Sequence, residues 1–264
     1  MVRQDLRGRQ DVRFISATVT ARREISADLW AMRIAPDGEF SFRAGQYATL
    51  GINTADRLIE RAYSIVSSPH EPELEFFIEL VPAGELTPLL YQLQVGDTLS
   101  VRRAAKGRFL LEAANPDTDH LLLGTVTGVA PFLSLIRTWQ RERQGETFAG
   151  DRRLFLLHGA SRASEFGYHE EIERIAGEVP WLTYVPTVSR PWEEAEWAGE
   201  IGRVDDVIRK YADQWVHEPG RAVAHLRGHP SMIEHGKAIL GRRGWHKDRL
   251  KEESYFALKH QEKD

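Results

Sequence analysis

Four consecutive residues, Arg61 to Ser64, combine a permanent cation, a flat aromatic ring and a small hydroxyl. In an extended segment Arg61 and Tyr63 point to the same face, so a guanidinium can bind a phosphate while the phenol ring stacks on an adjoining ring system. A bound dinucleotide would be held in this way. The alternative is a surface arginine beside a half-buried tyrosine in an ordinary strand, and these four residues alone favour that alternative.

Two nearby segments change the balance. Residues 42–47, Phe-Arg-Ala-Gly-Gln-Tyr, lie just upstream, and Gly84 to Pro88 opens the one helix expected in the first half of the chain. A phosphate beside a helix N-terminus gains from free backbone N–H groups and from the helix dipole, and Thr87 adds a hydroxyl there. Taken together, the three segments favour the ligand-binding interpretation.

In the second half, a glycine-bearing turn from Gly124 to Phe132 joins an apolar strand to a helix. Such a turn lets a phosphate approach the backbone at the carboxyl end of a parallel strand. Taken alone, the segment is better explained as a structural turn before a helix started by Pro131.

The chain ends with two further candidate segments. Residues 227–232, Arg-Gly-His-Pro-Ser-Met, form a turn between a strand and a helix, and residues 253–256, Glu-Ser-Tyr-Phe, stand eight residues before the last. A frayed polar tail is the alternative for the second segment. Two adjacent large aromatic residues in a charged terminus would be exposed without a ligand, so we favour a binding role.

Two different patterns must position these residues. The first half is rich in short β-branched or aromatic runs separated by turn residues, which predicts a small closed barrel. After residues 115–117 strands alternate with helices, which predicts a parallel, doubly wound sheet. The expected strands are 12–20, 29–34, 47–52, 62–66, 74–81, 98–102, 121–123, 154–158, 182–188 and 222–226, and the expected helices are 87–93, 132–141, 165–176 and 231–240.

Composition excludes several classes of protein. The chain has 264 residues, 42% hydrophobic and 28% charged, and no cysteine, which excludes disulfides, thiolate zinc sites and cysteine-ligated iron–sulfur clusters. The net charge of −4 gives no reason to expect nucleic acid as a partner. No histidine belongs to a group of residues typical of a metal site, so we expect no bound metal. Without a signal sequence or an apolar run of about 18 residues, we expect a cytoplasmic protein that does not enter a membrane.

The segments Gly45 to Tyr47, Arg61 to Ser64 and Gly84 to Thr87 resemble those of the ferredoxin–NADP reductase family, in particular its bacterial members. The resemblance implies that Arg61 contacts the pyrophosphate of FAD, Tyr63 packs on the isoalloxazine and Ser64 lies near flavin N5. It implies that Tyr255 covers the ring, Phe256 stacks on the adenine and Glu253 relays protons. The full set of implied FAD contacts is Arg61, Ala62, Tyr63, Ser64, Gly84, Leu86, Thr87, Thr127, Tyr255 and Phe256, and the implied catalytic residues are Ser64, Glu253 and Tyr255.

For NADP(H), the same resemblance implies contacts with Thr125, Gly128, Arg162, Ser189, Arg190, Arg203 and Arg227. Ser189, Arg190 and Arg203 stand where relatives that prefer NADPH hold the 2′-phosphate. A solvated surface arginine is the alternative for each one taken singly. The chain departs from the family pattern at Val126, where most relatives have glycine, at Ser161, where an arginine is common, and at Arg227, where a cysteine is usual.

We therefore expect an FAD-binding six-stranded antiparallel barrel in residues 1–116 and a parallel doubly wound NADP(H)-binding domain with a flavin-covering tail in residues 117–264. The resemblance implies a monomeric flavoprotein oxidoreductase that exchanges hydride at flavin N5 and transfers electrons between NADP(H) and ferredoxin or flavodoxin. Two alternatives remain open: a reductase of another acceptor, such as an oxygenase component or a ferric complex, and a flavin-binding module without turnover.

Overall fold

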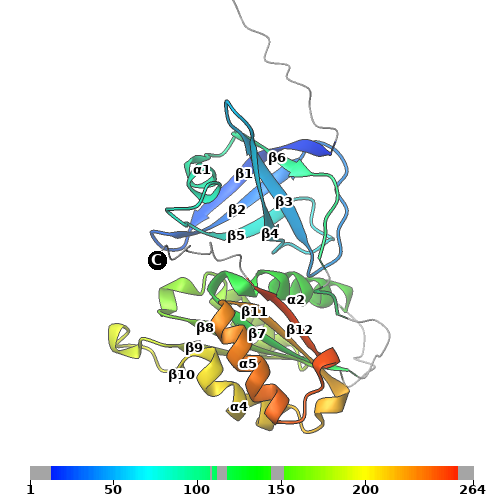
Figure 1. The fold of residues 1–264 in the computed structure, drawn as a ribbon, viewed down its shortest axis with the longest axis vertical. Coiled ribbons are helices and arrows are strands. Elements are labelled where there is room, and N and C mark those ends of the chain that lie inside the picture. Colours follow the sequence, from blue (N-terminus) through cyan, green and yellow to red (C-terminus); the bar gives the residue numbers. More distant parts are fainter. Residues whose placement is uncertain (1–12, 108, 112–117, 144–151, 255–264) are drawn as a thin grey trace, which may run out of the picture.

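The computed structural model describes residues 13–107, 109–111, 118–143 and 152–254. Two sheets of six strands each lie one above the other, with helix α2 between them (Figure 1). None of the helices in these ranges combines the length and the apolar character needed to cross a membrane.

The first sheet is antiparallel and has the strand order β4-β3-β6-β1-β2-β5. Just after β4, Ile65 bridges Phe76 of β5, and the Val66 N–H donates to the Glu75 carbonyl at 2.8 Å, so the sheet closes on itself. The alternating inward side chains fill the interior, as the strand period requires. The elements are β1 (Phe14–Glu24), β2 (Leu29–Pro36), β3 (Tyr47–Asn53), β4 (Leu58–Ser64), β5 (Leu74–Glu79), α1 (Thr87–Gln92) and β6 (Thr98–Arg102).

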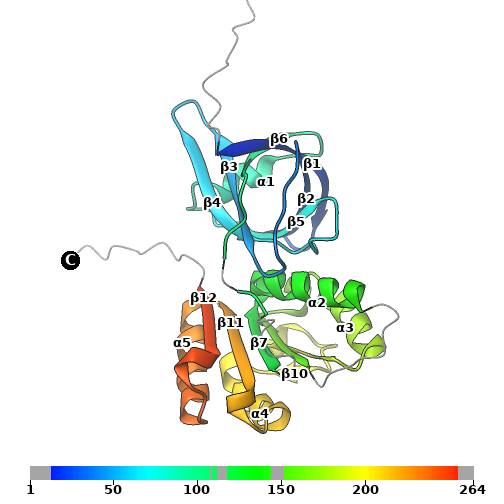
Figure 2. The same ribbon diagram turned by 90° about the vertical axis from the view of Figure 1, so that its right-hand side faces the viewer.

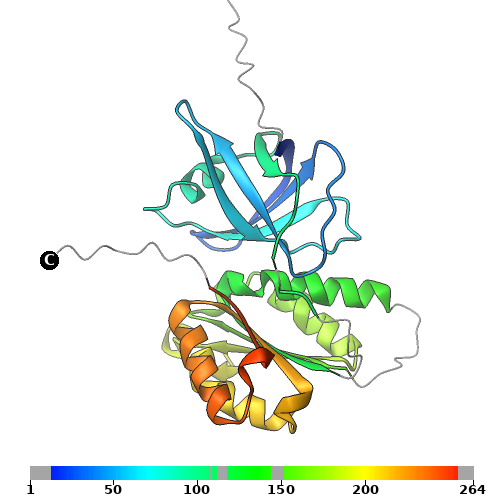
Figure 3. The same ribbon diagram turned by 45° about the vertical axis from the view of Figure 1, so that its right-hand side comes forward.

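The second sheet is parallel throughout and has the order β10-β9-β8-β7-β11-β12. Helices α2 and α3 cover one face and α4 and α5 the other (Figures 2 and 3), which gives two separate apolar clusters. The elements are β7 (Asp119–Thr125), α2 (Ala130–Glu142), β8 (Leu154–Ala160), α3 (His169–Glu178), β9 (Leu182–Val188), β10 (Glu200–Ile201), α4 (Val204–Trp215), β11 (Ala222–Gly228), α5 (Pro230–Arg242) and β12 (Leu250–Ser254).

The predicted fold class, an antiparallel barrel followed by a doubly wound parallel sheet, is confirmed. Three elements were not predicted: α4, β10 and β12. The prediction for β4 was wrong at both ends, because the strand begins at Leu58 and ends at Ser64 rather than spanning 62–66. Its first residues pair with β3 (Ile52 with Ile59) although their side chains are only partly buried, so no apolar run marks the beginning of the strand.

An apolar cluster joins the barrel to helices α2 and α3. It contains Phe77 of β5 and Phe132 of α2, and the Phe77 ring meets the Tyr168 ring edge-on with centroids 5.4 Å apart. Within this apolar contact the Glu75 carboxylate is 5% exposed. It accepts hydrogen bonds from Arg137 at 2.7 Å, Arg33 at 3.0 Å and the Tyr168 hydroxyl at 2.8 Å.

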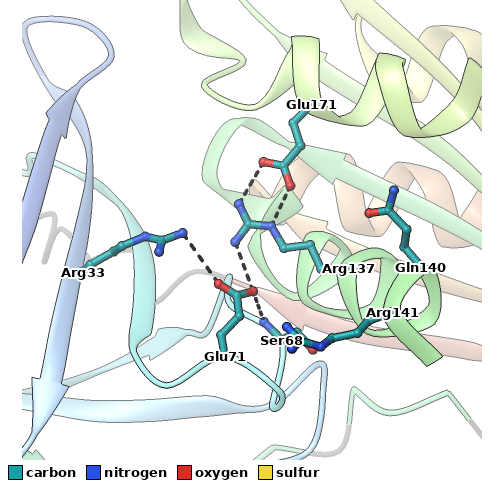
Figure 4. A pocket seen from close by; sticks show the side chains of 7 residues that line it. All are labelled: Arg33, Ser68, Glu71, Arg137, Gln140, Arg141 and Glu171. Carbon is teal, nitrogen blue, oxygen red and sulfur yellow. Dashed lines mark hydrogen bonds and ion pairs between the residues drawn. The ribbon is translucent and has the colours of Figure 1, made fainter. Parts of the chain in front are cut away.

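These bonds hold Glu75 in its charged form. Burial alone would raise the pKa of this carboxyl, but Arg137, Tyr168 and Arg33 together lower it below its ordinary value. A cavity of about 510 Å³ opens beside the network (Figure 4), where Arg137 also binds Glu171 through two bonds of 2.7 and 2.8 Å. Because Arg33, Arg137, Glu71 and Glu171 on its wall are paired with one another, the cavity is the open side of an ion-pair network.

The Arg137→Met substitution should lower the free energy of unfolding by about 3 kcal/mol, because it leaves a buried carboxylate without its principal cation. Arg141→Met is the matched control, since Arg141 is exposed one turn further along the same helix. Urea denaturation measures both variants. Equal losses in the two variants would show that the buried network adds nothing to stability.

Two buried histidines should make folding depend on pH. His120 and His225 face each other across β7 and β11, with Nδ1 of the first 3.1 Å from Nε2 of the second. Burial lowers the pKa of His120 to about 3 and that of His225 well below its ordinary value, so the folded chain keeps both neutral. Unfolded histidines bind protons below about pH 6.5, so stability is present above that pH and falls by about 1.4 kcal/mol per pH unit for each histidine below it.

Replacing both histidines by leucine should therefore reduce the dependence of unfolding free energy on pH between about pH 6 and 5, and His158, whose pKa burial lowers to about 4, should retain part of it. The pair is replaced together because removing both partners of a buried hydrogen bond is nearly neutral for stability, whereas removing one is not. A variant that carries His217→Gln and His246→Gln, both exposed positions, is the control and should keep the wild-type slope. An unchanged slope in the leucine variant would contradict the assignment.

Candidate active site

The carboxyl ends of the parallel strands gather most of the second-half candidates at one edge of the sheet. Ligands bind outside this edge in doubly wound folds, at the point where the strand order reverses. Here the chain winds from β7 outward to β10 and then returns to β11, so the reversal lies between β7 and β11. In Figure 2 the ends of β11 and β12 face the barrel.

Thr125 and Gly228 lie close together at this reversal of strand order. The His229 N–H donates to Thr125 Oγ1 at 3.1 Å, which ties the end of β7 to the loop after β11. Gly228 has φ +136°, and a Cβ at this position would lie 2.0 Å from Thr125 Oγ1. The approach of the two loops therefore requires glycine at position 228.

The turn after β7 is a single 3-10 turn, Val126–Val129, that runs directly into α2. Among the residues that the structure describes, Val126 is the one non-glycine residue with a positive φ, +44°. This conformation is unfavourable for a β-branched residue and costs about 1–3 kcal/mol. The departure from glycine seen in the sequence therefore puts strain into the turn.

His158 forms a hydrogen bond to the strained turn. Its Nε2 lies 2.9 Å from the Val126 carbonyl oxygen, and its Nδ1 lies 3.4 Å from the Tyr184 hydroxyl. Burial lowers the pKa of His158 to about 4, so the ring is neutral and Nε2–H donates to Val126. Sequence reasoning treated this histidine as a structural group at a strand end and did not connect it with the turn.

Arg227 and Glu253 form an ion pair. They are register partners on the parallel strands β11 and β12, and the Arg227 guanidinium contacts the Glu253 carboxylate. Leu226 packs on the α4 and α5 side, so by alternation Arg227 faces the opposite side, as His225 does, whose ring contacts Phe109 with centroids 5.0 Å apart. Tyr255 and Phe256 lie outside the described residues.

Arg162 and Arg190 follow the neighbouring strands β8 and β9 and converge on one carboxylate. Glu193 lies 2.6 Å from Arg162 Nε and 3.5 Å from Arg190 Nη1. Arg203, at the beginning of α4, instead pairs with Asp205 at 3.2 Å, and its Nη2 donates to Ser231 Oγ at 3.4 Å. The sequence singled out the three arginines but missed Glu193, which looked like one acid among several in an acidic loop.

On the barrel side, Tyr63 and Ser64 end β4 close to α2. Three residues further on, the Ser67 carbonyl accepts a bond from Ser134 of α2 at 2.7 Å. Burial raises the pKa of Tyr63, so the phenol stays protonated. The Ser64 hydroxyl oxygen is buried and has no hydrogen-bond partner in the described part of the chain.

The Arg61 guanidinium is half exposed and already has an anionic partner. Its Nη2 lies 2.6 Å from Glu85, which also contacts Arg57. The Thr87 hydroxyl accepts from the Val81 N–H at 3.0 Å and donates to the Val81 carbonyl at 3.1 Å, so it closes the loop that carries Gly84. Leu86 is buried in the barrel core. Glu85 was not singled out in the sequence, where only its glycine and threonine neighbours carried a pattern.

Comparison with known proteins gives this arrangement a class. Residues 16–110 match the family described as oxidoreductase FAD-binding domain, and residues 122–237 match the oxidoreductase NAD-binding domain. The crystal structure of a ferredoxin–NADP⁺ reductase from Neisseria gonorrhoeae with bound FAD and NADP is 25% identical and has a TM-score of 0.79, covering 93% of this chain and 100% of that one. The fold and the site thus define a flavoprotein oxidoreductase with FAD and a nicotinamide dinucleotide as its cofactors.

The curated relatives narrow the class. Ferredoxin–NADP reductase A of Sorangium cellulosum is 31% identical over 227 residues, which are 82% of this chain and 79% of that protein. The ferredoxin–NADP reductase of Pseudomonas aeruginosa is 33% identical over 213 residues, which are 75% of this chain and 78% of that protein. The chain belongs to the ferredoxin–NADP reductase family, and the resemblance found in the sequence is confirmed.

Val126→Gly should tighten the binding of NADP⁺ by about 1 kcal/mol, roughly fivefold, because glycine accepts the positive φ and removes a branched side chain from the turn that we assign to the phosphates of NADP(H). The change in unfolding free energy should be small, since relief of strain is offset by the entropy of glycine in the unfolded chain. Titration calorimetry with NADP⁺ measures the effect. Val126→Ala, which keeps the strained φ of a residue with Cβ, should gain less. Unaltered affinity in the glycine variant would contradict the prediction.

Proposed function

We propose that this chain is an NADP(H)-dependent flavoprotein reductase that exchanges electrons with a one-electron carrier protein, ferredoxin or flavodoxin. One observation carries the proposal. The carboxyl ends of the parallel strands, which we assign to the dinucleotide, lie next to the end of barrel strand β4. A hydride donor on one side and its acceptor on the other must meet with their rings stacked, and a fixed contact between the two sheets supplies that geometry.

The barrel residues fit FAD. The buried Ser64 hydroxyl without a protein partner suits a hydrogen bond to the flavin, and the half-buried Tyr63 ring beside it suits a stacked isoalloxazine. Arg61 lies in the exposed middle of the same strand, where it can bind the pyrophosphate in exchange for Glu85. When bound, FAD supplies hydride exchange at N5 and the conversion of two-electron into one-electron transfer.

The parallel sheet fits NADP(H). Thr125 and Gly128 are assigned to the pyrophosphate of NADP(H), whereas Thr127, buried in the same turn, is assigned to FAD. Ser189, Arg190, Arg162 and Arg203 are assigned to the 2′-phosphate end. Arg227 and Glu253 stand at the other end of the edge, where their paired charges keep an arginine from facing the nicotinamide alone.

Glu253 is proposed to hold or move a proton at its carboxylate, which contacts the Arg227 guanidinium. Tyr255 and Phe256, beyond the described residues, remain proposed as the cover of the flavin ring and of the adenine. We place the boundary between the two domains at 116/117, between the matched ranges 16–110 and 122–237. The protein is proposed to act as a monomer.

The acceptor is the least constrained part of the proposal. A basic rim formed by Arg22, Arg23, Arg102, Arg103 and Lys106 would suit an acidic carrier, but three of these arginines have internal partners. Arg22 bonds to the Tyr91 carbonyl at 2.7 Å, Arg23 to the Gly167 carbonyl at 3.1 Å and Arg102 to Glu60 at 2.8 Å. An acceptor other than ferredoxin or flavodoxin is therefore the second candidate, and rates with a panel of carriers, an oxygenase component and a ferric complex separate the two.

Mixing the purified protein with NADPH should bleach its flavin absorbance, and heat should release FAD rather than FMN. NADPH should be preferred to NADH, and Arg190→Ala should reduce that preference about tenfold, because a charge-assisted bond to the 2′-phosphate is lost. Arg174→Ala, an exposed arginine of α3, is the control. A flavin that NADPH does not bleach would identify a binding module without turnover, and FMN as the only flavin would overturn the barrel assignment.

A further inference from the structure

The Glu193 carboxylate occupies the two arginines that the proposed function assigns to the 2′-phosphate. One carboxylate oxygen lies 2.6 Å from Arg162 Nε and the other 3.5 Å from Arg190 Nη1. The two arginines come from the loops after β8 and β9, adjacent strands of the sheet. A single anion thus bridges both loops at the carboxyl edge.

The backbone sets the position of Glu193. It ends the short 3-10 turn Pro191–Glu193, and its N–H donates to the Arg190 carbonyl at 3.0 Å. The Arg190 N–H in turn donates to the Ser161 carbonyl at 3.1 Å, which ties the two loops together. The backbone of the turn therefore fixes the position of Glu193 beside the arginines.

The neighbouring residue also indicates a ligand at this loop. The Trp192 side chain is 76% exposed, which is unusual for so large an apolar ring. An exposed indole offers a flat surface on which an adenine can stack. Arg190, Trp192 and Glu193 then present a cation, an aromatic face and an anion within four residues, a set that suits the adenosine end of a dinucleotide.

A carboxylate and a phosphate compete for the same guanidinium groups. A 2′-phosphate carries two negative charges and must displace Glu193 or share the arginines with it at the cost of repulsion. A ribose 2′-hydroxyl is instead a hydrogen-bond donor that a carboxylate accepts, which is how acidic residues at this edge of doubly wound folds recognise NAD. The Glu193 side chain therefore weakens the binding of the cofactor with a 2′-phosphate and favours the binding of the cofactor with a 2′-hydroxyl.

We propose that Glu193 is a specificity-determining residue that lowers the preference for NADPH over NADH by occupying Arg162 and Arg190. The inference deepens the proposed function and rests on it.

The test measures binding of two fragments to the full-length, flavin-loaded protein: 2′-phospho-AMP and AMP, by titration calorimetry. Glu193→Gln should tighten the binding of 2′-phospho-AMP and should weaken the binding of AMP or leave it unchanged. The ratio of the two affinities should therefore rise about fivefold. Glu196→Gln, an exposed acid three positions further along the same loop, is the matched control and should leave the ratio unchanged. The ratio of kcat/KM for NADPH and NADH should move in the same direction.

An affinity ratio that is the same in wild type and Glu193→Gln would overturn the inference while leaving the proposed function intact. An equal rise in the Glu196→Gln control would also overturn it, because general removal of negative charge would then be the cause. If the wild-type protein binds neither fragment and NADPH does not reduce its flavin, the proposed function fails together with the inference.

Discussion

The buried Glu75 carboxylate is the contact on which the geometry of the whole molecule depends. The apolar cluster between the barrel and helices α2 and α3 supplies most of the attraction, but apolar contacts are non-directional and allow two packed units to slide. Arg137 of α2 and Tyr168 at the beginning of α3 reach Glu75 of the barrel in only one arrangement, because each hydrogen bond has a narrow range of distance and angle. A reductase that must hold two rings stacked needs this kind of constraint, since small displacements reduce the rate of hydride transfer steeply.

Carboxylates accompany the arginines that we assign to phosphate groups. Arg61 has Glu85, Arg162 and Arg190 have Glu193, and Arg203 has Asp205. In each case the carboxylate orients the guanidinium and neutralises it, so the site exists before a ligand arrives. The consequence for binding is competition, because a phosphate gains only the difference between its own bond to arginine and the ion pair that it replaces. This pairing gives the chain a different balance of affinities from one in which the same arginines are solvated.

Strain is concentrated where the nucleotide turn meets the sheet. Val126 takes a left-handed conformation, and neutral His158 bonds to its carbonyl from the adjacent strand. Gly228 and Thr125 close the other side of the turn at a distance that excludes a Cβ. The surrounding sheet therefore overdetermines a backbone conformation that valine by itself disfavours, as is common at ligand-binding turns.

The features that could be predicted from the amino-acid sequence are those that depend on residues close together in the chain. Alternating apolar residues and turn residues predicted the barrel strands and the βα units, and the local patterns at Arg61 to Ser64 and Gly124 to Phe132 indicated the cofactors. Helix α4 was not predicted, although Val204, Val207, Ile208 and Tyr211 recur at helical spacing. The polar strand β12 carried no such signal, because pairing with β11 and not its own composition makes it a strand. Which charges meet over long stretches of the chain was set by tertiary packing: Arg227 with Glu253, Arg162 with Glu193 and Glu75 with Arg137. Strand register and the packing of the barrel on α2 bring together groups that no local pattern connects.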